Sequence, residues 1–179
     1  MELTRRCDYA CRILRSAYRH QDGYVSIAEV SEEEEIPYAF ARTIQHDLAT
    51  AGFVKTVRGA HGGLALSIDP ADTTVLDVLR ALQGPVTVAP CAADPSTCSL
   101  SDGCTFNRVW IAADEALSAL FGSLTLKDVF DGTPDGAFLD EARSNANAQV
   151  VSSVDDLLSG KLPLSCSQIA EKASIAEGA

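Results

Sequence analysis

Three cysteines in one short polar segment are the residues of this chain best suited to chemistry. Six residues separate Cys91 from Cys98 and five separate Cys98 from Cys104, and Ala, Asp, Pro, Ser and Gly are frequent between them. Thiolates are soft ligands that suit zinc or iron–sulfur clusters. The spacing lacks the close cysteine pair of a zinc ribbon, and three thiols leave one position for another ligand or for solvent. The segment predicts a metal or cluster site; the alternative is three unliganded surface thiols.

The other cysteines and the histidines do not extend this set. Cys7 and Cys11 share a helical face with apolar residues and are expected to be small buried hydrophobes, although Cys7 is next to Asp8 and could act as a ligand. Cys166 is interpreted as incidental. The three histidines are not spaced as metal ligands: His20, His46 and His61.

Length and charge limit the function classes. The chain has 179 residues, and no apolar run approaches the roughly 20 residues of a membrane span. Polar residues follow the first arginines, so a secretion signal is not expected and we predict a cytoplasmic protein.

The net charge is −11, but residues 1–67 carry 8 Lys and Arg against 9 Asp and Glu, whereas residues 68–179 carry 6 against 16. Outside the run of four glutamates at residues 32–35, which we interpret as a solvated face, the first third is locally basic and compatible with nucleic acid.

The first third has the element order of a winged helix-turn-helix. An amphipathic helix is expected over residues 3–20, and a capping box of Ser26 and Glu29 starts a second helix that runs to about Glu34. Pro37 starts a third helix, which Gly52 ends. The expected buried stripe of this helix is Phe40, Ile44 and Leu48. We predict two strands joined by a glycine-rich loop, at residues 53–58 and 64–68.

This order predicts a mainly α fold with a small β wing, in which the third helix enters a DNA major groove and the hairpin touches backbone or minor groove. The expected wing contacts are Arg58 and His61. Arg42 is the best candidate for reading guanine. The expected major-groove residues are Tyr38, Arg42, Thr43 and Gln45.

Later segments predict a dimer. A fourth helix is expected after a cap at Asp72 or Thr73, with Gly84 and Pro85 as its stop. Apolar residues recur every three or four positions from Phe106 to Phe121, a stripe that could pair with a second copy of the chain. The predicted organisation begins with a DNA-binding domain over residues 1–84 and a cluster-binding loop over 85–104. A dimerisation helix and a short following helix are predicted over 105–130. The rest, 131–179, is predicted to be a partly disordered tail with one helical pattern at 150–158.

The chain resembles the family of iron–sulfur winged-helix transcription regulators that includes IscR and NsrR. The resemblance covers residues 1 to about 130. It is carried by the segments 1–4, 8–10, 51–54, 57–59, 62–64, 77–78, 81–82 and 124–128, together with the capping box at Ser26 and the three cysteines.

The resemblance implies a homodimer that binds a pseudo-palindromic operator on double-stranded DNA, with an iron–sulfur cluster that tunes this binding. In the IscR-like pattern a histidine lies three residues after the third cysteine, where this chain has Asn107, a poor iron ligand. In the NsrR-like pattern an aspartate near the start of the first helix reaches the partner's cluster, and Asp8 occupies that place. The implied site is Cys91, Cys98 and Cys104 plus Asp8 of the partner subunit around a 4Fe–4S cluster, with 2Fe–2S as the alternative. The other interpretation of Asp8 is a surface ion pair with Arg12.

Several functions remain open at this point. The expected signal is nitric oxide, redox state or cluster supply. The rivals are a cluster-free regulator controlled by a partner or metabolite, a zinc-stabilised winged helix, and a redox protein with no DNA role. The chain lacks a second cofactor motif or a nucleophile and base pair, so we do not expect an enzyme.

Overall fold

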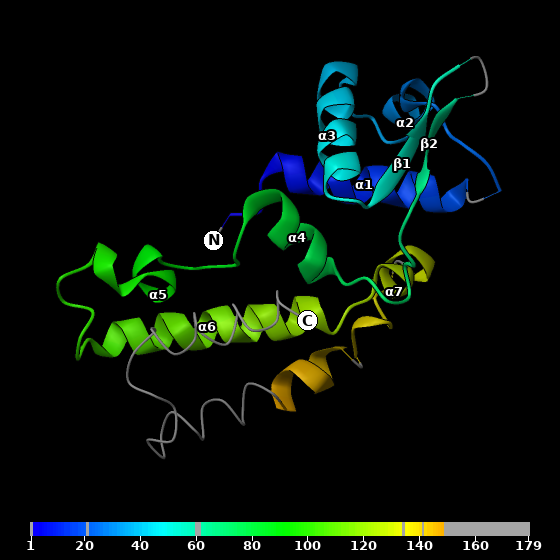
Figure 1. Ribbon diagram of the computed structural model, residues 1–179. Coiled ribbons are helices and arrows are strands. Elements are labelled where there is room, and N and C mark those ends of the chain that lie inside the picture. The colour runs from blue at the N-terminus through cyan, green and yellow to red at the C-terminus, as the bar shows by residue number, and fades with distance from the viewer. Residues whose placement is uncertain (1, 21, 60–61, 134, 141, 149–179) are drawn as a thin grey trace. The chain divides into compact units, whose positions relative to one another are not determined.

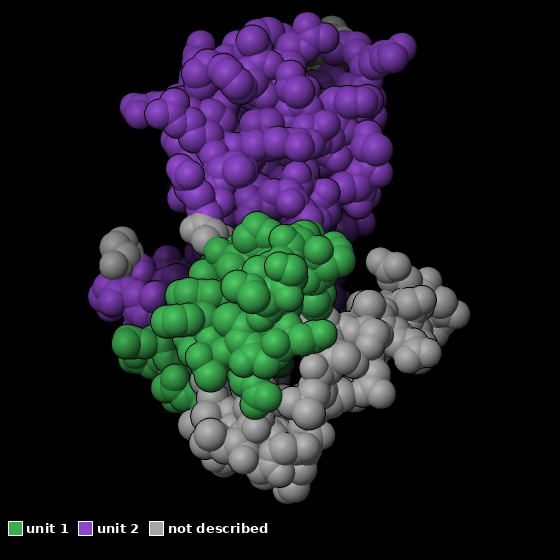
Figure 2. Space-filling view, turned by 90° about the vertical axis from the view of Figure 1, so that its left-hand side faces the viewer, with its two compact units in different colours: residues 1, 85–123, 140–179 green, residues 2–84, 124–139 purple. Residues whose placement is uncertain are grey.

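The computed structural model describes residues 2–20, 22–59, 62–133, 135–140 and 142–148 (Figure 1). The chain divides into two compact units, coloured separately in Figure 2. Of the described residues, 2–84 and 124–139 form what we term the N-terminal unit, and 85–123, 140 and 142–148 form the cysteine unit. Among the described residues, no helix combines the length and the apolar character needed to cross a membrane.

The N-terminal unit is a winged helix-turn-helix, as predicted. Three helices precede a two-stranded antiparallel hairpin, and two further helices complete the unit (Figure 1). The elements are α1 (Arg5–Arg19), α2 (Ile27–Glu33), α3 (Tyr38–Thr50), β1 (Val54–Val57), β2 (Gly63–Leu66), α4 (Val75–Gln83) and α7 (Leu126–Asp131).

Side-chain caps define the starts of the short helices. The predicted capping box is present at α2: Glu29 N–H donates to Ser26 Oγ at 3.2 Å, and Ser26 N–H donates to Glu29 Oε2 at 2.9 Å. The predicted cap of α4 at Asp72 or Thr73 is wrong. Thr74 is the N-cap, because its hydroxyl accepts from the backbone of Asp77, three residues on, and the Asp77 carboxylate accepts from Thr74 N–H.

The buried stripe of α3 differs from the prediction at one position. Ala41, Ile44 and Leu48 are at most 2% exposed, whereas Phe40 is 61% exposed. Phe40 lies in the first turn of α3, at the edge of the face that Ile44 and Leu48 bury, so its four-residue spacing from Ile44 does not carry it into the core. Gly52 ends the helix region with φ of 82°, the left-handed conformation expected of a helix stop.

The wing is tied to the helical core through the segment between α1 and α2. Val54 pairs with Leu66 and Val57 with Gly63 across the hairpin. Val25 forms an antiparallel bridge with Leu64, with N–H···O distances of 2.8 and 3.0 Å. A side chain at Gly63 would collide with the Val25 carbonyl, so this close backbone approach needs glycine.

The run of four glutamates is not simply a solvated face. The Glu34 side chain is 2% exposed, and α1 presents three arginines to it. Arg15 Nε donates to Glu34 Oε1 at 3.1 Å, Arg19 Nη1 lies 3.3 Å from the same oxygen, and Arg12 Nε lies 3.6 Å from Glu34 Oε2. This long-range pairing explains the burial of Glu34, because a buried carboxylate needs cationic hydrogen-bond donors around it.

We predict that Glu34→Gln lowers the free energy of unfolding by about 2 kcal/mol. Loss of one partner from a buried ion-pair cluster is costly, and the partial exposure of the three arginines reduces that cost. Urea denaturation followed by circular dichroism measures the change. Glu32→Gln removes the same charge from an exposed position and is the matched control. Equal effects of the two substitutions would contradict the structural role of Glu34.

The cysteine unit consists of α5 (Pro90–Ala93), the 3-10 turn η1 (Pro95–Thr97) and the long helix α6 (Thr105–Gly122). The predicted long apolar helix is therefore confirmed as a helix. Residues 142–148, inside the segment predicted as a partly disordered tail, are also helical. The helical pattern predicted at residues 150–158 lies outside the described residues.

Candidate nucleic-acid interface and cysteine loop

The outer face of α3 presents side chains of the kinds that read DNA bases. Arg42 is exposed, makes no ion pair with any described residue, and lies one turn after Tyr38, which is 50% exposed. Thr43 donates its hydroxyl hydrogen to the Ala39 carbonyl at 3.1 Å, so its methyl group is the more available part of the side chain. Gln45 is half-buried at the edge of this face.

The wing adds a second cationic position. Arg58 follows β1 directly, is exposed, and is without an ion pair in the described part of the chain. The predicted wing residue His61 lies outside the described residues. Gly59 has φ of 124°, and Gly62 N–H donates to the Gly59 carbonyl at 3.0 Å, which closes the loop after Arg58.

Acidic side chains of the N-terminal unit hold four of the five arginines of α1. Glu34 binds the arginines of the second half of α1, and Asp47 of α3 binds Arg6 with a 2.8 Å ion pair. The basic residues among residues 2–59 without a described acidic partner are Arg5, Arg42, Lys55 and Arg58. Within residues 2–59, the positive charge that remains available for phosphate or base contacts therefore lies on α3, the wing and the start of α1.

The three cysteines occupy successive parts of one loop. Cys91 lies in α5, Cys98 follows η1, and Cys104 is the N-cap of α6. All three are half-buried and free of disulfides. No side chain caps the first turn of α6, so its N–H groups are open to an acceptor such as sulfur. In the described residues, no three His, Cys, Asp or Glu side chains lie close enough together to hold a single metal ion.

Two polar residues of α6 attach the loop to the helix. Asn107 is 7% exposed, and its Nδ2 donates to the Cys91 carbonyl at 2.7 Å. The Asp114 carboxylate accepts from Val88 N–H at 2.6 Å and from the Thr87 hydroxyl at 3.0 Å. Sequence reasoning treated Asn107 only as a poor ligand and missed its role in holding the segment that carries Cys91.

The cysteines of α1 differ in exposure: Cys7 is buried and Cys11, which was also expected to be buried, is half-buried. Cys7 is fully buried, as predicted, and its thiol donates to Gln83 Oε1 at 3.1 Å. Burial, with smaller contributions from Cys7 and Asp8, raises the pKa of Cys11 to about 12. Cys11 is therefore a neutral thiol at physiological pH when no metal is bound.

Asp8 has the ion pair that the sequence suggested, but the pair is weak. Its carboxylate lies 3.5 Å from Arg12 Nη1, and the Asp8 side chain is 54% exposed. Arg12 also lies 3.6 Å from the Glu34 carboxylate and donates to the Glu34 carbonyl oxygen, so it is held chiefly by Glu34. The Asp8 carboxylate is consequently accessible to a further ligand.

The fold and the exposed face of α3 define a winged helix-turn-helix transcription regulator. The profile of the Rrf2 family, described as an iron-dependent transcriptional regulator, matches residues 3–132. This chain belongs to the Rrf2 family. It is a DNA-binding transcription regulator and not an enzyme.

Individual relatives support the same assignment. The chain is 28% identical to the transcriptional regulator NsrR of Bacillus subtilis over 137 residues, covering 75% of this chain and 94% of that protein. It is 31% identical to protein aau3 of Rhizobium meliloti over 143 residues, covering 78% and 91%. The structure of CymR (YrzC), the global cysteine regulator of B. subtilis, matches with a TM-score of 0.63 at 26% identity, covering 74% of this chain and 98% of that chain. T. potens IscR matches with a TM-score of 0.60 at 25% identity, covering 72% and 85%.

We predict that Arg42→Ala weakens binding to a duplex selected by this protein from a random pool by roughly 5- to 150-fold, because a bidentate guanine contact contributes about 1–3 kcal/mol of discrimination. Fluorescence anisotropy at fixed salt measures the affinity. Specificity should relax at the base position that Arg42 contacts.

Arg80→Ala, which removes the same charge from an exposed position on α4, is the matched control and is expected to have little effect. A similar loss in both variants, with unchanged base preference, would show that Arg42 acts only through net charge.

Proposed function

We propose that this chain is a homodimeric regulator, acting on DNA in the cytoplasm, whose operator binding is controlled by an iron–sulfur cluster. The observation that carries the proposal is the set of three free, half-buried thiols, Cys91, Cys98 and Cys104, in one loop that α6 holds by hydrogen bonds. The iron dependence in the description of the matching family supports the same proposal.

The donor set fits a soft metal centre. Thiolates are the usual ligands of iron–sulfur clusters, and the uncapped N-terminus of α6 behind Cys104 favours a site of negative charge. Ligands of a metal site often converge only when the metal binds, because metal binding is coupled to folding. We propose a 4Fe–4S cluster, with 2Fe–2S as the alternative. When bound, such a cluster supplies a centre that reacts with oxidants and nitric oxide.

Asp8 of the partner subunit is the proposed fourth ligand. Asn107 is a poor candidate because its amide is already bonded to the Cys91 carbonyl. Asp8 has an accessible carboxylate with only a long contact to Arg12. A carboxylate binds iron less strongly than a thiolate, so this ligand would be the first to leave, which suits a sensor.

Dimerisation through α6 is supported by its exposed apolar residues. Phe106 is 67% exposed and Val109 is 55% exposed, while the ring of Phe106 stacks on Trp110 with centroids 6.2 Å apart. These residues belong to the apolar stripe of an 18-residue helix, which a second copy of the chain would cover.

The start of α1 has direct contacts that would transmit a change at Asp8 to the DNA-reading helix. Two residues before Asp8, Arg6 forms a 2.8 Å ion pair with Asp47 of α3 and donates to the Leu82 carbonyl of α4 at 3.2 Å. Thr4 and Cys7 both donate to Gln83 near the end of α4. A shift of the first turn of α1 would therefore be felt by α3 and α4, and a two-state dimer would convert it into a change of operator affinity.

A cluster-free regulator controlled by a partner or metabolite is the second candidate. It is favoured by the separation of the three thiols, which form no metal-binding group in the described residues. A zinc-stabilised form is a further variant of this candidate. Metal analysis distinguishes the iron–sulfur form from the cluster-free form and from the zinc form.

The cluster is tested by purification without oxygen. We predict coloured protein with roughly four iron and four sulfide per protomer, and loss of both in Cys98→Ala. Cys11→Ala is the control, since that thiol is neutral and lies in the N-terminal unit, and it should keep its iron. Nitric oxide should bleach the visible absorption of the wild-type protein. Colourless protein with stoichiometric zinc, or equal iron in wild type and Cys98→Ala, would rule out the proposed cluster.

The transmission route is tested by Asp47→Asn, which removes the ion pair with Arg6 and keeps the side-chain size. We predict unchanged iron content and a smaller ratio of operator affinities between cluster-loaded and cluster-free protein. Asp72→Asn, at an exposed position before α4, is the control and should leave the ratio unchanged. An undiminished ratio in Asp47→Asn would show that the signal does not pass through this contact.

A further inference from the structure

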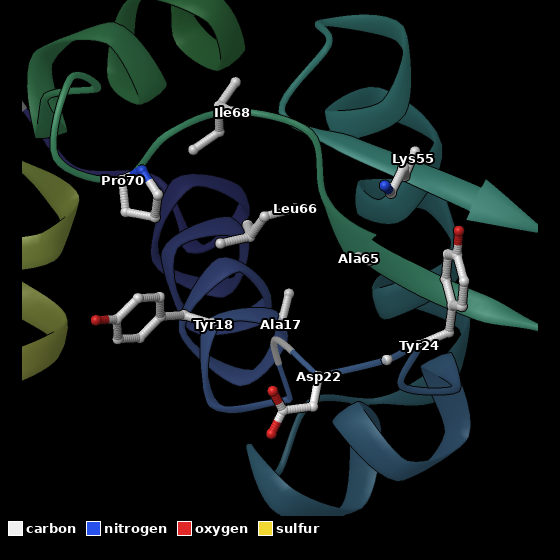
Figure 3. Close-up of a pocket in the computed structure, with 10 residues that line it drawn as sticks. Ala17, Tyr18, Asp22, Tyr24, Lys55, Ala65, Leu66, Ile68 and Pro70 are labelled. Carbon is white, nitrogen blue, oxygen red and sulfur yellow. The ribbon is translucent and has the colours of Figure 1, made fainter.

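A hollow of about 380 Å³ lies in the N-terminal unit, and none of its lining residues belongs to α3 or to the cysteine unit. It is formed by the end of α1, the segment that follows α1, the wing strands and the connection after β2 (Figure 3). Its volume is at the small end of the range of ligand pockets, which suits a small metabolite. The lining residues are Ala17, Tyr18, Asp22, Gly23, Tyr24, Lys55, Ala65, Leu66, Ile68 and Pro70.

Several contacts fix the walls of this hollow. Tyr18 donates its hydroxyl hydrogen to Asp131 Oδ1 at 2.9 Å, and its ring centroid lies 5.3 Å from that of Phe130 in α7. The bridge between Val25 and Leu64 holds the segment that carries Asp22 and Tyr24 against β2. The site is therefore largely preformed, which lowers the entropic cost of binding a ligand.

Two opposite charges at the rim have no described partner. Lys55 is exposed and pairs across the hairpin with Ala65, whose small side chain leaves space beside the lysine stem. Asp22 is exposed on the segment after α1. Neither forms an ion pair with a described residue, although acidic partners hold Arg6 and the later arginines of α1.

The rest of the lining is apolar or phenolic. Figure 3 draws Tyr24 and Lys55 on one side of the view and Tyr18 and Pro70 on the opposite side, with Leu66 and Ile68 between them. A ligand in this hollow would meet the ammonium group of Lys55, the phenol of Tyr24 and the carboxylate of Asp22. Its remaining surface would face aliphatic side chains. A phosphate-rich ligand is disfavoured because Asp22 would repel it, and a purely apolar ligand would leave both rim charges desolvated.

We propose that this hollow binds a free α-amino acid with an apolar side chain. The ligand carboxylate would lie at Lys55 and Tyr24, the ligand ammonium at Asp22, and the side chain against Leu66, Ile68 and Pro70. Such a ligand would join the wing to α1, so its binding is expected to change operator affinity. The proposal is independent of the cluster, because no lining residue belongs to the proposed ligand set.

Isothermal titration calorimetry on the full chain tests the proposal with L-leucine and L-phenylalanine as probes. We expect saturable binding of at least one of them. Isopentylamine and 4-methylpentanoate, which each keep one charge of leucine, and L-glutamate, which adds a negative charge, should bind at least tenfold more weakly. Lys55→Gln and Asp22→Asn should each lower the affinity for the amino acid by at least tenfold.

The controls are Arg80→Gln and Asp72→Asn, which remove the same charges from exposed positions outside the hollow and should leave binding unchanged. Cys98→Ala should also bind the amino acid normally, which separates this site from the proposed cluster. Absence of binding by both amino acids would overturn the proposal, as would binding that Lys55→Gln and Asp22→Asn leave intact. If Lys55→Gln weakened only duplex DNA binding, Lys55 would be a phosphate contact instead.

Discussion

The ion-pair cluster around Glu34 is the interaction on which the arrangement of the N-terminal unit depends. It joins α1 to the end of α2 and places the carboxylate of one helix among the arginines of the other. Its neighbour Glu33 accepts hydrogen bonds from Ser16 and His20, which hold the pKa of Glu33 below its usual value. Because these acids bind four of the five arginines of α1 together with Asp47, the cations of residues 2–59 left without a described acidic partner lie on α3, the wing and the start of α1. The net charge of −11 is therefore compatible with a DNA-binding protein.

Local sequence signals predicted the elements well because they depend on neighbours in the chain. The capping box at Ser26, the glycine stop at Gly52 and the apolar period of α6 all act within one or two helical turns. The errors have the same origin. Thr74 was missed because Asp72 and Thr73 are also good capping residues, and only the structure shows which side-chain oxygen faces the free N–H group. Phe40 was assigned to the core because periodicity does not say where the covering neighbours end.

The candidate site was predictable in part. The type and spacing of the three cysteines indicated soft-metal chemistry, and the position of Arg42 on the outer face of α3 followed from the helical period. The partners of these residues were not predictable, since they come from distant positions. Examples are the hydrogen bond from Asn107 to the Cys91 carbonyl and the ion pair of Arg6 with Asp47. Another is the raised pKa of Cys11, which results from burial. The types and positions of the candidate ligands and DNA-contacting residues follow from the sequence. Tertiary packing decides which of these side chains are charged, accessible and held in place.

Helix α1 combines these constraints. One part of its surface enters the core through Cys7, Ala10, Ile13 and Leu14, which are fully buried, and another binds α2 through the arginines around Glu34. Its first turns contact α3 and α4 through Arg6 and Cys7. Asp8 lies in this region with an accessible carboxylate, so the proposed ligand bond there would act on the part of α1 that contacts α3, the helix proposed to read DNA, while the Glu34 cluster holds the other end. A sensor benefits from this division, because one end of the helix can respond while the fold itself stays intact.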